Sequence, residues 1–326
     1  MNSPLKKIII EGYKSIKSTE IEFGDINIIL GANSVGKSNI MSVIELIKSV
    51  YEGTLEKLIK ESGGANAYFH YGTKNTARIK LQMIFADKKY ELSIKSSADD
   101  SVEIEYETFS KISPRKLYPI VLYHFHDTGK YSPLKKSCDS GNCNYLYADG
   151  SNFPAVLYRI KNEAPDNFEK IIDTIRLVYP EFENFIFDIS DGNISIRWSD
   201  STVKNFEYPI SAMSDGTLRF AAISTLMLQP SPPELIMIDE PELGLHPFAI
   251  NVLSDLIHMA SLNSQILIST QSIQLINNFE AFDILIAEYT NGGTVITRPN
   301  LEELEDWLKK YSIGEIWQRN VFGGNP

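Results

Sequence analysis

Residues 31–39, "GANSVGKSN", combine glycine, lysine and serine in a spacing suited to binding phosphate. The pattern G-x-x-x-x-G-K-[ST] follows an aliphatic run at 26–30 and opens a helical pattern. Glycine lets the backbone turn its N–H groups around phosphate oxygens, Lys37 would reach the β- and γ-phosphates, and Ser38 would ligate Mg²⁺. An ordinary glycine-containing turn is the alternative, but a match of this kind in this context rarely arises by chance. The predicted nucleotide-binding residues are Gly31, Ala32, Asn33, Ser34, Val35, Gly36, Lys37, Ser38 and Asn39.

Two adjacent acids form the second feature that could do chemistry. Residues 234–247 read "ELIMIDEPELGLHP", an apolar strand that ends in Asp239 and Glu240. Asp239 could hold the Mg²⁺ together with Ser38, and Glu240 is placed to orient and polarise an attacking water. A strand that ends in a solvated acidic turn is the alternative, and the presence of the Lys37 loop weighs against it.

A third feature precedes the acid strand. Ser214, Asp215 and Gly216 stand before a helical pattern, about twenty-five residues ahead of Asp239. Serine and glycine at a helix start can face an anion with backbone N–H groups. In isolation these residues are most often a simple helix cap, so only their spacing from the acids favours a functional role.

Periodicity predicts the elements that position these residues. Strand-length apolar runs or alternations lie at 6–10, 26–30, 79–83, 102–106, 120–125, 235–239 and 265–269, with further strands up to 298. Helical patterns begin at Lys37, 216 and 247 and occupy 153–162 and 167–178, whereas 127–152 has the composition of a loop. The alternation of strand and helix in the later part favours parallel βαβ units and an α/β fold.

Composition restricts the class of protein. The 326 residues are 43% hydrophobic and include two cysteines, which is typical of a folded protein in a reducing compartment rather than a disulfide scaffold. We expect a cytoplasmic protein without a membrane partner, because no run of about 18 uncharged apolar residues occurs. The net charge of -11 argues against non-specific coating of nucleic acid, although a local basic groove is compatible with an acidic total.

Four segments taken in order resemble a known group of proteins. "GANSVGKSN", "SDGTLR", "LIMIDEPELGLHP" and "ISTQS" are similar to the ABC-type ATPase heads of the RecF, SMC and OLD group, in particular its compact bacterial AAA family ATPases. "IIIEGYKSI", "YFHYGTKNTARI", "YHFHDTG", "DGSNFPAVLYRI" and the tail "YSIGEIWQRNVFGGNP" also look like that family. The resemblance implies a P-loop NTPase fold of the ABC-ATPase head type. We expect an N-terminal head part at 1–85 and a C-terminal part at 205–299, with an inserted mixed α/β segment at 86–204 and a helical tail at 300–326.

The resemblance also implies roles for single residues. The loop from Gly31 to Ser38 would be the Walker A motif, Asp239 the Walker B acid and Glu240 the catalytic glutamate. Ser214, Asp215 and Gly216 would be the signature that binds the γ-phosphate in trans, and Leu243 to His246 would be the D-loop. Gln271 stands where related heads have a switch histidine, and its neutral amide predicts slow turnover. The glutamine of the family's Q-loop is not identified, since Gln82 falls in a predicted strand.

The resemblance leaves the biological task open. One expectation is an ATP- and Mg²⁺-dependent homodimer that regulates a separate effector, a nuclease or toxin, for example in phage defence. The alternative is a nucleic-acid-binding ATPase in DNA repair or recombination. A scaffold that binds nucleotide without turnover is a third reading, against which Glu240 argues. Residues 86–204 lack heptads for coiled-coil arms, and only 28 residues follow Arg298, so we expect neither SMC-type tethering nor a nuclease domain of the OLD type.

Several other residues have two readings. His124, His126, Cys138 and Cys143 could ligate zinc, although their spacing is not that of a standard finger and the histidines could simply pack. Arg219 could contact a dimer partner or nucleotide, or be an exposed helix residue. We expect Lys135 and Lys136 on a solvated loop, and the aromatic residues Tyr118, Tyr123 and Phe125 in the core.

Overall fold

Two units make up the chain in the computed structural model, which describes residues 4–97, 100–110 and 120–324. The first unit comprises Met1–Leu122, Glu234–Asp239 and Ser264–Pro326, and the second comprises Tyr123–Pro233 and Glu240–Asn263. One boundary between the units falls between Asp239 and Glu240, the two acids that the sequence singles out.

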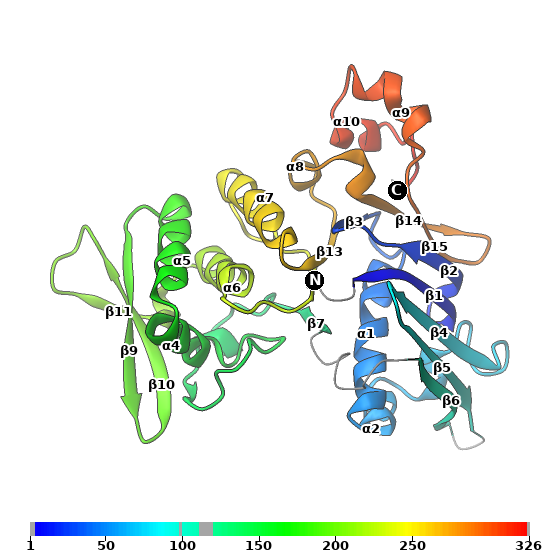
Figure 1. Ribbon diagram of the computed structural model, residues 1–326, viewed down its shortest axis with the longest axis horizontal. Helices are drawn as coiled ribbons and strands as arrows, with labels where there is room; N and C mark the ends of the chain where they lie inside the picture. Colours follow the sequence, from blue (N-terminus) through cyan, green and yellow to red (C-terminus); the bar gives the residue numbers. More distant parts are fainter. Residues whose placement is uncertain (1–3, 98–99, 111–119, 325–326) are drawn as a thin grey trace. The chain divides into compact units, whose positions relative to one another are not determined.

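A mostly parallel sheet of six strands belongs to the first unit (Figure 1). Its strands in spatial order are β15 (Gly293–Thr297), β14 (Ile284–Thr290), β3 (Ile26–Leu30), β13 (Gln265–Thr270), β12 (Leu235–Asp239) and β7 (Ile120–Tyr123). β3 is parallel to both β13 and β14, and β12 is parallel to β13. All residues of β3 are buried, as expected for a strand covered on both faces. The carboxyl ends of β3, β13 and β12 therefore meet at one edge of the sheet.

The first unit also contains an antiparallel sheet with the order β2-β1-β4-β5-β6. Its strands are β1 (Leu5–Tyr13), β2 (Ile16–Glu22), β4 (Arg78–Phe85), β5 (Lys89–Ser96) and β6 (Val102–Ser110). Helix α1 (Lys37–Tyr51) shares a hydrophobic core with this sheet and with β3. The helix buries the apolar positions 40, 43, 44, 47 and 50, which confirms the spacing that predicted it.

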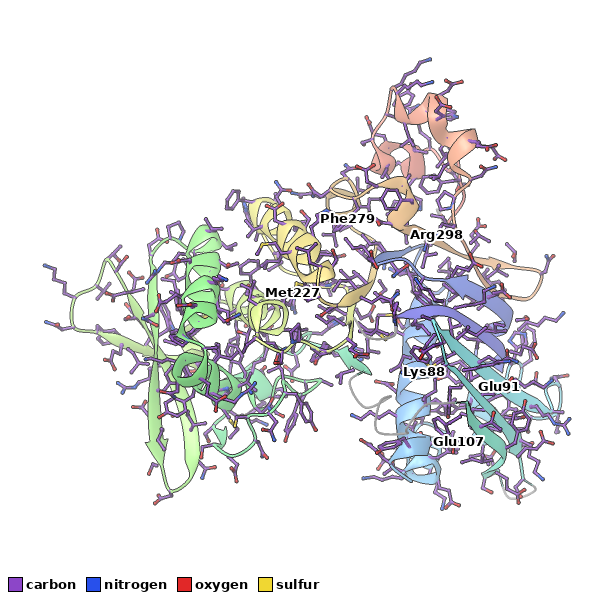
Figure 2. The ribbon with its side chains drawn as sticks, in the orientation of Figure 1. Lys88, Glu91, Glu107, Met227, Phe279 and Arg298 are labelled. Atoms are coloured by element: carbon purple, nitrogen blue, oxygen red, sulfur yellow. The ribbon has the colours of Figure 1, made fainter. Side chains whose placement is uncertain are left out.

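The outer strand β6 of the antiparallel sheet is acidic. Glu103, Glu105 and Glu107 alternate along it and are exposed, and Figure 2 labels Glu107 on this strand. Arg78 on β4 forms a two-pronged contact with Glu105 at 2.7 and 2.8 Å, and Lys95 on β5 lies 3.0 Å from Glu103. Cross-strand ion pairs thus connect the edge to the inner strands.

Short helices complete the first unit. They are α2 (Leu55–Glu61), α3 (Ala65–Tyr68), α8 (Ile273–Ile276), α9 (Leu301–Leu308) and α10 (Ile313–Gln318). Ser312 and Glu315 form a capping box at the start of α10, and the Gly314 N–H donates to the Asn277 side chain at 2.7 Å, which holds the tail on the end of α8. Within the described residues, no helix is long and apolar enough to span a membrane.

The second unit places four helices beside a small sheet. The helices are α4 (Phe153–Glu163), α5 (Pro165–Val178), α6 (Asp215–Leu228) and α7 (Pro247–Ser261), and the strands are β8 (Cys138–Asp139), β9 (Phe182–Ser190), β10 (Asn193–Asp200) and β11 (Glu207–Pro209). In Figure 1, α4 and α5 lie on the β9–β10 hairpin, and α6 lies between α5 and α7. Every residue of α6 from Leu218 to Leu228 is buried, so this helix is the centre of the unit.

The structure confirms the α/β class and most predicted elements. β3 and β12 have the predicted bounds, and α7 begins at the predicted residue. The predicted loop at 127–152 contains only a short helical turn, Pro133–Lys135, and the two-residue strand β8. Tyr123 and Phe125 are buried as predicted, whereas Tyr118 lies outside the described residues.

Candidate functional site

The loop between β3 and α1 has a backbone that requires glycine. Gly36 precedes α1 with a φ of 101°, in the left-handed region. A Cβ atom there would lie 2.3 Å from the Thr294 hydroxyl and 2.4 Å from the Ser15 hydroxyl, and one at Gly31 would lie 2.7 Å from the Ala287 carbonyl oxygen. At both glycines of the predicted phosphate-binding motif, a larger residue would therefore clash with neighbouring atoms.

Lys37 is buried at the first position of α1. Its ammonium group donates to the carbonyl oxygens of Gly31 and Ala32 at 2.6 and 2.9 Å, so the side chain lies along its own loop. Neutral carbonyl oxygens are weaker acceptors for an ammonium group than phosphate oxygens. The lysine is thus held where an incoming phosphate could take over its hydrogen bonds, as the motif predicts.

A cluster of three polar side chains contacts the loop between β3 and α1. The Thr294 hydroxyl donates to the Val35 carbonyl at 2.6 Å and lies 2.7 Å from the Ser15 hydroxyl. Asn39 on α1 donates to the same serine hydroxyl at 2.8 Å. Asn39 was predicted as a nucleotide-binding residue, whereas Ser15 and Thr294 had no predicted role, since nothing in the local pattern around them indicates this contact.

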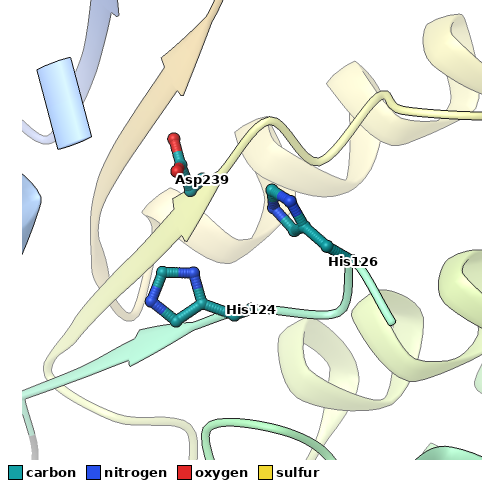
Figure 3. Close-up of side chains that lie close together, drawn as sticks. All are labelled: His124, His126 and Asp239. Atoms are coloured by element: carbon teal, nitrogen blue, oxygen red, sulfur yellow. The ribbon is translucent and has the colours of Figure 1, made fainter. Parts of the chain in front are cut away.

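Asp239 and Gln271 follow neighbouring strands at the same edge as this loop. Asp239 ends β12, as Figure 3 shows, and accepts a hydrogen bond from Ser269, its paired residue on β13. Gln271 follows β13 and donates through its amide to the side-chain oxygen of Asn33 in the loop. The first unit therefore brings together the loop, the strand-end acid and the residue at the switch position. Ser269 is a further residue that sequence analysis missed.

The donor set at this edge fits Mg²⁺. Ser38 is exposed on the first turn of α1, and Asp239 is half-buried at the end of β12. A hydroxyl and a carboxylate are oxygen ligands of the kind that Mg²⁺ prefers, with phosphate oxygens and waters completing its coordination. Gln82, by contrast, lies within β4, where sequence analysis had placed it.

Glu240 has an unusual backbone conformation. Its φ is 42°, a left-handed value that is uncommon for a residue other than glycine, asparagine or aspartate. It is the first residue of its segment in the second unit, directly after Asp239 in the chain. Strained conformations of this kind concentrate at functional sites, which agrees with a role for this carboxylate.

The predicted signature and D-loop are in direct contact within the second unit. The Ser214 hydroxyl caps α6 by accepting from the Thr217 N–H at 3.2 Å. A Cβ atom at Gly216 would lie 2.5 Å from the Gly244 carbonyl oxygen, so only glycine allows the two segments to approach this closely. Ser214, Asp215 and Leu243 are exposed, which leaves this surface accessible.

Two basic residues beside the signature differ from expectation. Lys135 is not solvated: its side chain is 8% exposed and lies 3.0 Å from the Asp215 carboxylate, whereas Lys136 is exposed as predicted. Arg219 is buried, which contradicts its reading as an exposed helix residue. Its guanidinium donates to the backbone carbonyls of Phe125, His126 and Leu243, so its helix is bound to two other segments of the second unit.

The predicted zinc ligands do not come together. His124 and His126 follow β7 with their ring centroids 6.0 Å apart (Figure 3). Among the described residues, Cys138 and Cys143 join no group of three or more metal-ligating side chains with them. Burial also raises the pKa of the Cys138 thiol, which disfavours the thiolate that zinc requires. The predicted set of four zinc ligands is therefore not assembled, and of the two histidines His124 is half-buried and His126 is exposed.

Comparison with known proteins identifies the family. Residues 26–277 match the model of the family described as "AAA domain, putative AbiEii toxin, Type IV TA system". The chain belongs to this family. The matched range includes the predicted Walker A loop and signature, together with Asp239, Glu240 and Gln271. The family confirms the resemblance to SMC-, RecF- and OLD-like ATPases.

Two curated relatives have longer chains than this one. The Old nuclease of Escherichia phage P2 is 23% identical over 96% of this chain and 64% of its own length. The chromosome partition protein Smc of Mycoplasma pneumoniae is 24% identical over 95% of this chain and 30% of its own length. The chain thus spans less than two thirds of each relative.

Solved structures show the same fold. An SMC head bound to the C-terminal winged-helix domain of ScpA superposes with a TM-score of 0.67 at 17% identity, over 93% of this chain and 99% of that one. An Smc head with an extended coiled coil from Pyrococcus furiosus superposes with a TM-score of 0.63 at 16% identity, over 94% and 99% of the two chains. The predicted P-loop ATPase head fold is confirmed.

Proposed function

We propose that this protein binds ATP with Mg²⁺ and hydrolyses it slowly, and that nucleotide binding drives its dimerisation. The observation that carries the proposal is the meeting of the Lys37 loop, Asp239 and Gln271 at one edge of the parallel sheet. The loop N–H groups and Lys37 bind the phosphates, and Ser38 and Asp239 hold the Mg²⁺, which neutralises charge on the phosphates. Glu240 orients the attacking water and accepts its proton.

The accessible signature surface supports a composite site. Ser214 of the signature and Leu243, Gly244 and His246 of the D-loop are exposed on the second unit. In a two-fold dimer, the signature of one chain would cap the ATP held by Lys37 of the other, which gives two equivalent sites. The family and the SMC-head fold support this arrangement by analogy.

We further propose that the ATPase cycle regulates a separate effector protein, a nuclease or toxin, as part of defence against phage. The family description, which names a toxin system, and the similarity to the Old nuclease of a phage support this choice. The net charge of -11 is also better suited to a protein partner than to a polyanion. A nucleic-acid-binding ATPase is the second candidate, and the similarity to a chromosome partition protein favours it.

Two variants test the chemistry. Lys37→Ala should lose ATP binding because the phosphates lose their cation, whereas Glu240→Gln should keep binding and lose turnover. Filter binding of labelled ATP and phosphate release measure the two properties. Glu240→Gln should also accumulate as an ATP-bound dimer in light scattering. Normal turnover in that variant would remove Glu240 from the mechanism, and a monomer at saturating ATP and Mg²⁺ would count against nucleotide-driven dimerisation.

A further inference from the structure

Arg219 connects three segments that are far apart in the sequence. It lies on α6, five residues after the signature serine, and its side chain is buried. Nε donates to the Phe125 carbonyl at 2.9 Å, one terminal nitrogen donates to the His126 carbonyl at 3.0 Å, and the other donates to the Leu243 carbonyl in the D-loop. One guanidinium thus joins the signature helix, the segment after β7 and the D-loop within the second unit.

This arrangement has an electrostatic cost. The three acceptors are neutral carbonyl oxygens, and burial lowers the pKa of the Arg219 guanidinium even though Asp215 and Glu242 oppose that shift. Taking a cation out of water is unfavourable unless its donors are well satisfied. A planar guanidinium can satisfy them here because its N–H groups point in fixed directions toward several acceptors at once. An apolar side chain would fill the space without that cost but could not form hydrogen bonds to the D-loop or to the segment after β7.

The D-loop and signature are otherwise held by a close backbone contact. Gly216 approaches the Gly244 carbonyl so closely that a Cβ atom would lie 2.5 Å from it, and Gly244 itself has a φ of 74°. Glycine-rich backbone has many alternative conformations, so this contact needs a side chain to fix it. Arg219 donates to the carbonyl directly before Gly244. Lys135 contacts the Asp215 carboxylate and also donates to the Thr128 carbonyl.

We propose that Arg219 is a positioning residue that fixes the D-loop against the signature, so that both meet the partner's nucleotide in one geometry. The inference rests on the proposed composite site and assigns Arg219 to the signature half of that site. In this role Arg219 acts through its own chain, because each of its three side-chain nitrogens donates to a carbonyl of that chain. Its loss should therefore impair turnover in trans and leave ATP binding by the same chain intact.

The first experiment separates binding from turnover. Arg219→Met keeps a long unbranched side chain and removes the three nitrogens that donate to the carbonyls. We expect kcat to fall about ten- to a hundredfold with the ATP dissociation constant unchanged, because misplacing catalytic segments affects the reacting geometry. Arg219→Lys, which keeps the charge but not the planar fork, should recover only part of kcat.

A matched control is available in the same unit. Arg176 on α5 also donates to backbone carbonyls, those of Phe182 and Glu183, but it connects α5 to β9 rather than the signature to the D-loop. Arg176→Met should therefore lower the melting temperature without a selective loss of kcat. If Arg176→Met and Arg219→Met lose kcat equally at the same melting temperature, the effect is general destabilisation and the proposal is wrong.

The second experiment tests whether Arg219 belongs to the signature half of the composite site. Arg219→Met mixed with Lys37→Ala gives heterodimers in which one site has both halves intact, so equal mixing with free exchange should recover roughly a quarter of wild-type turnover. Arg219→Met mixed with Ser214→Arg should recover nothing, because both changes damage the signature half. Recovery in the second mixture, or none in the first, would overturn the assignment.

A positive control keeps the two proposals distinguishable. Lys37→Ala mixed with Ser214→Arg must itself recover turnover. If it does not, the composite site fails, whatever Arg219 does. If this mixture does recover turnover, two results would contradict the positioning role of Arg219. One is wild-type turnover in Arg219→Met alone, and the other is a rise in its ATP dissociation constant that matches its loss of kcat. Should Arg219→Met not fold, Arg219→Lys takes its place in both experiments.

Discussion

At the scale of single residues, we expect the neutral side chain of Gln271, at the predicted switch position, to limit the rate of ATP hydrolysis. Gln271 donates its amide to the Asn33 side chain and so is tied to the Walker A loop. Glutamine can offer a hydrogen bond to a phosphate or water, but it cannot carry a positive charge. Gln271 therefore contacts the predicted nucleotide loop, and in the proposed site it would stabilise a transition state only weakly.

We expect Gln271→Ala to reduce turnover by less than Glu240→Gln. Loss of a general base costs about a hundred- to ten-thousandfold, whereas the amide supplies only one neutral hydrogen bond. Phosphate release under matched conditions measures both variants. Gln271→Glu is a control that keeps the length of the side chain but replaces the amide donor with a carboxylate, which repels phosphate. A loss in Gln271→Ala as complete as that in Glu240→Gln would show that the glutamine is essential.

At the scale of elements, the nucleotide loop depends on two connections that lie outside it. Ser15 belongs to the turn between β1 and β2, and Thr294 belongs to β15. Their hydroxyls lie 2.7 Å apart, and Thr294 holds the Val35 carbonyl directly before Gly36. The left-handed conformation at Gly36 is therefore supported by side chains from both ends of the sequence.

We expect Thr294→Val to weaken ATP binding about tenfold, because the loop loses the hydroxyl that orients the Val35 carbonyl. Valine has nearly the same shape, so packing is preserved, and Thr294→Ser should restore binding by returning the hydroxyl. Titration calorimetry with ATP and Mg²⁺ compares the three proteins. Unchanged affinity in Thr294→Val would mean that the loop keeps its shape without this contact.

The sequence predicted those parts of the site that lie within continuous segments. The Walker A loop and the strand with Asp239 were recognisable because motif, apolar run and helix start follow one another directly. Ser15 and Thr294 were not, because their contact joins residues 279 positions apart and depends on where a turn and a strand end meet. The contacts of Arg219 were not predicted for the same reason, since its acceptors at 125 and 126 lie more than ninety residues away.

One hairpin that was not predicted nevertheless had a signal in the sequence. The β9–β10 hairpin turns at Asp191 and Gly192, a dipeptide that favours a tight hairpin between alternating apolar residues. Asp191 has a φ of 51° and Gly192 a φ of 78°, as such a turn requires. By contrast, the helices predicted at 153–162 and 167–178 are present as α4 and α5, and each buries an apolar face.

At the scale of the whole molecule, the acidic balance distinguishes the two candidate functions. The chain has 42 acidic and 31 basic residues, so binding to nucleic acid would require its basic side chains to gather on one surface. We expect no gel shift of DNA or RNA at moderate salt, with or without ATP. The measurement is a titration of salt with Glu240→Gln as the trapped form and Lys37→Ala as the control. A shift that needs ATP and weakens steeply as salt rises would instead establish the nucleic-acid-binding ATPase.

The acidic strand β6 also bears on how the protein behaves at high concentration. An unpaired strand at the edge of a sheet is a template on which another chain can add, and this is a common route to aggregation. Arg78 lowers the pKa of Glu105 to about 2 through its hydrogen bonds, so that carboxylate stays charged well into the acid range. With Glu103 and Glu107 on either side, two copies of the strand would bring rows of like charge together. If the protein dimerises through its nucleotide sites as proposed, this row of charge would disfavour a competing association through β6.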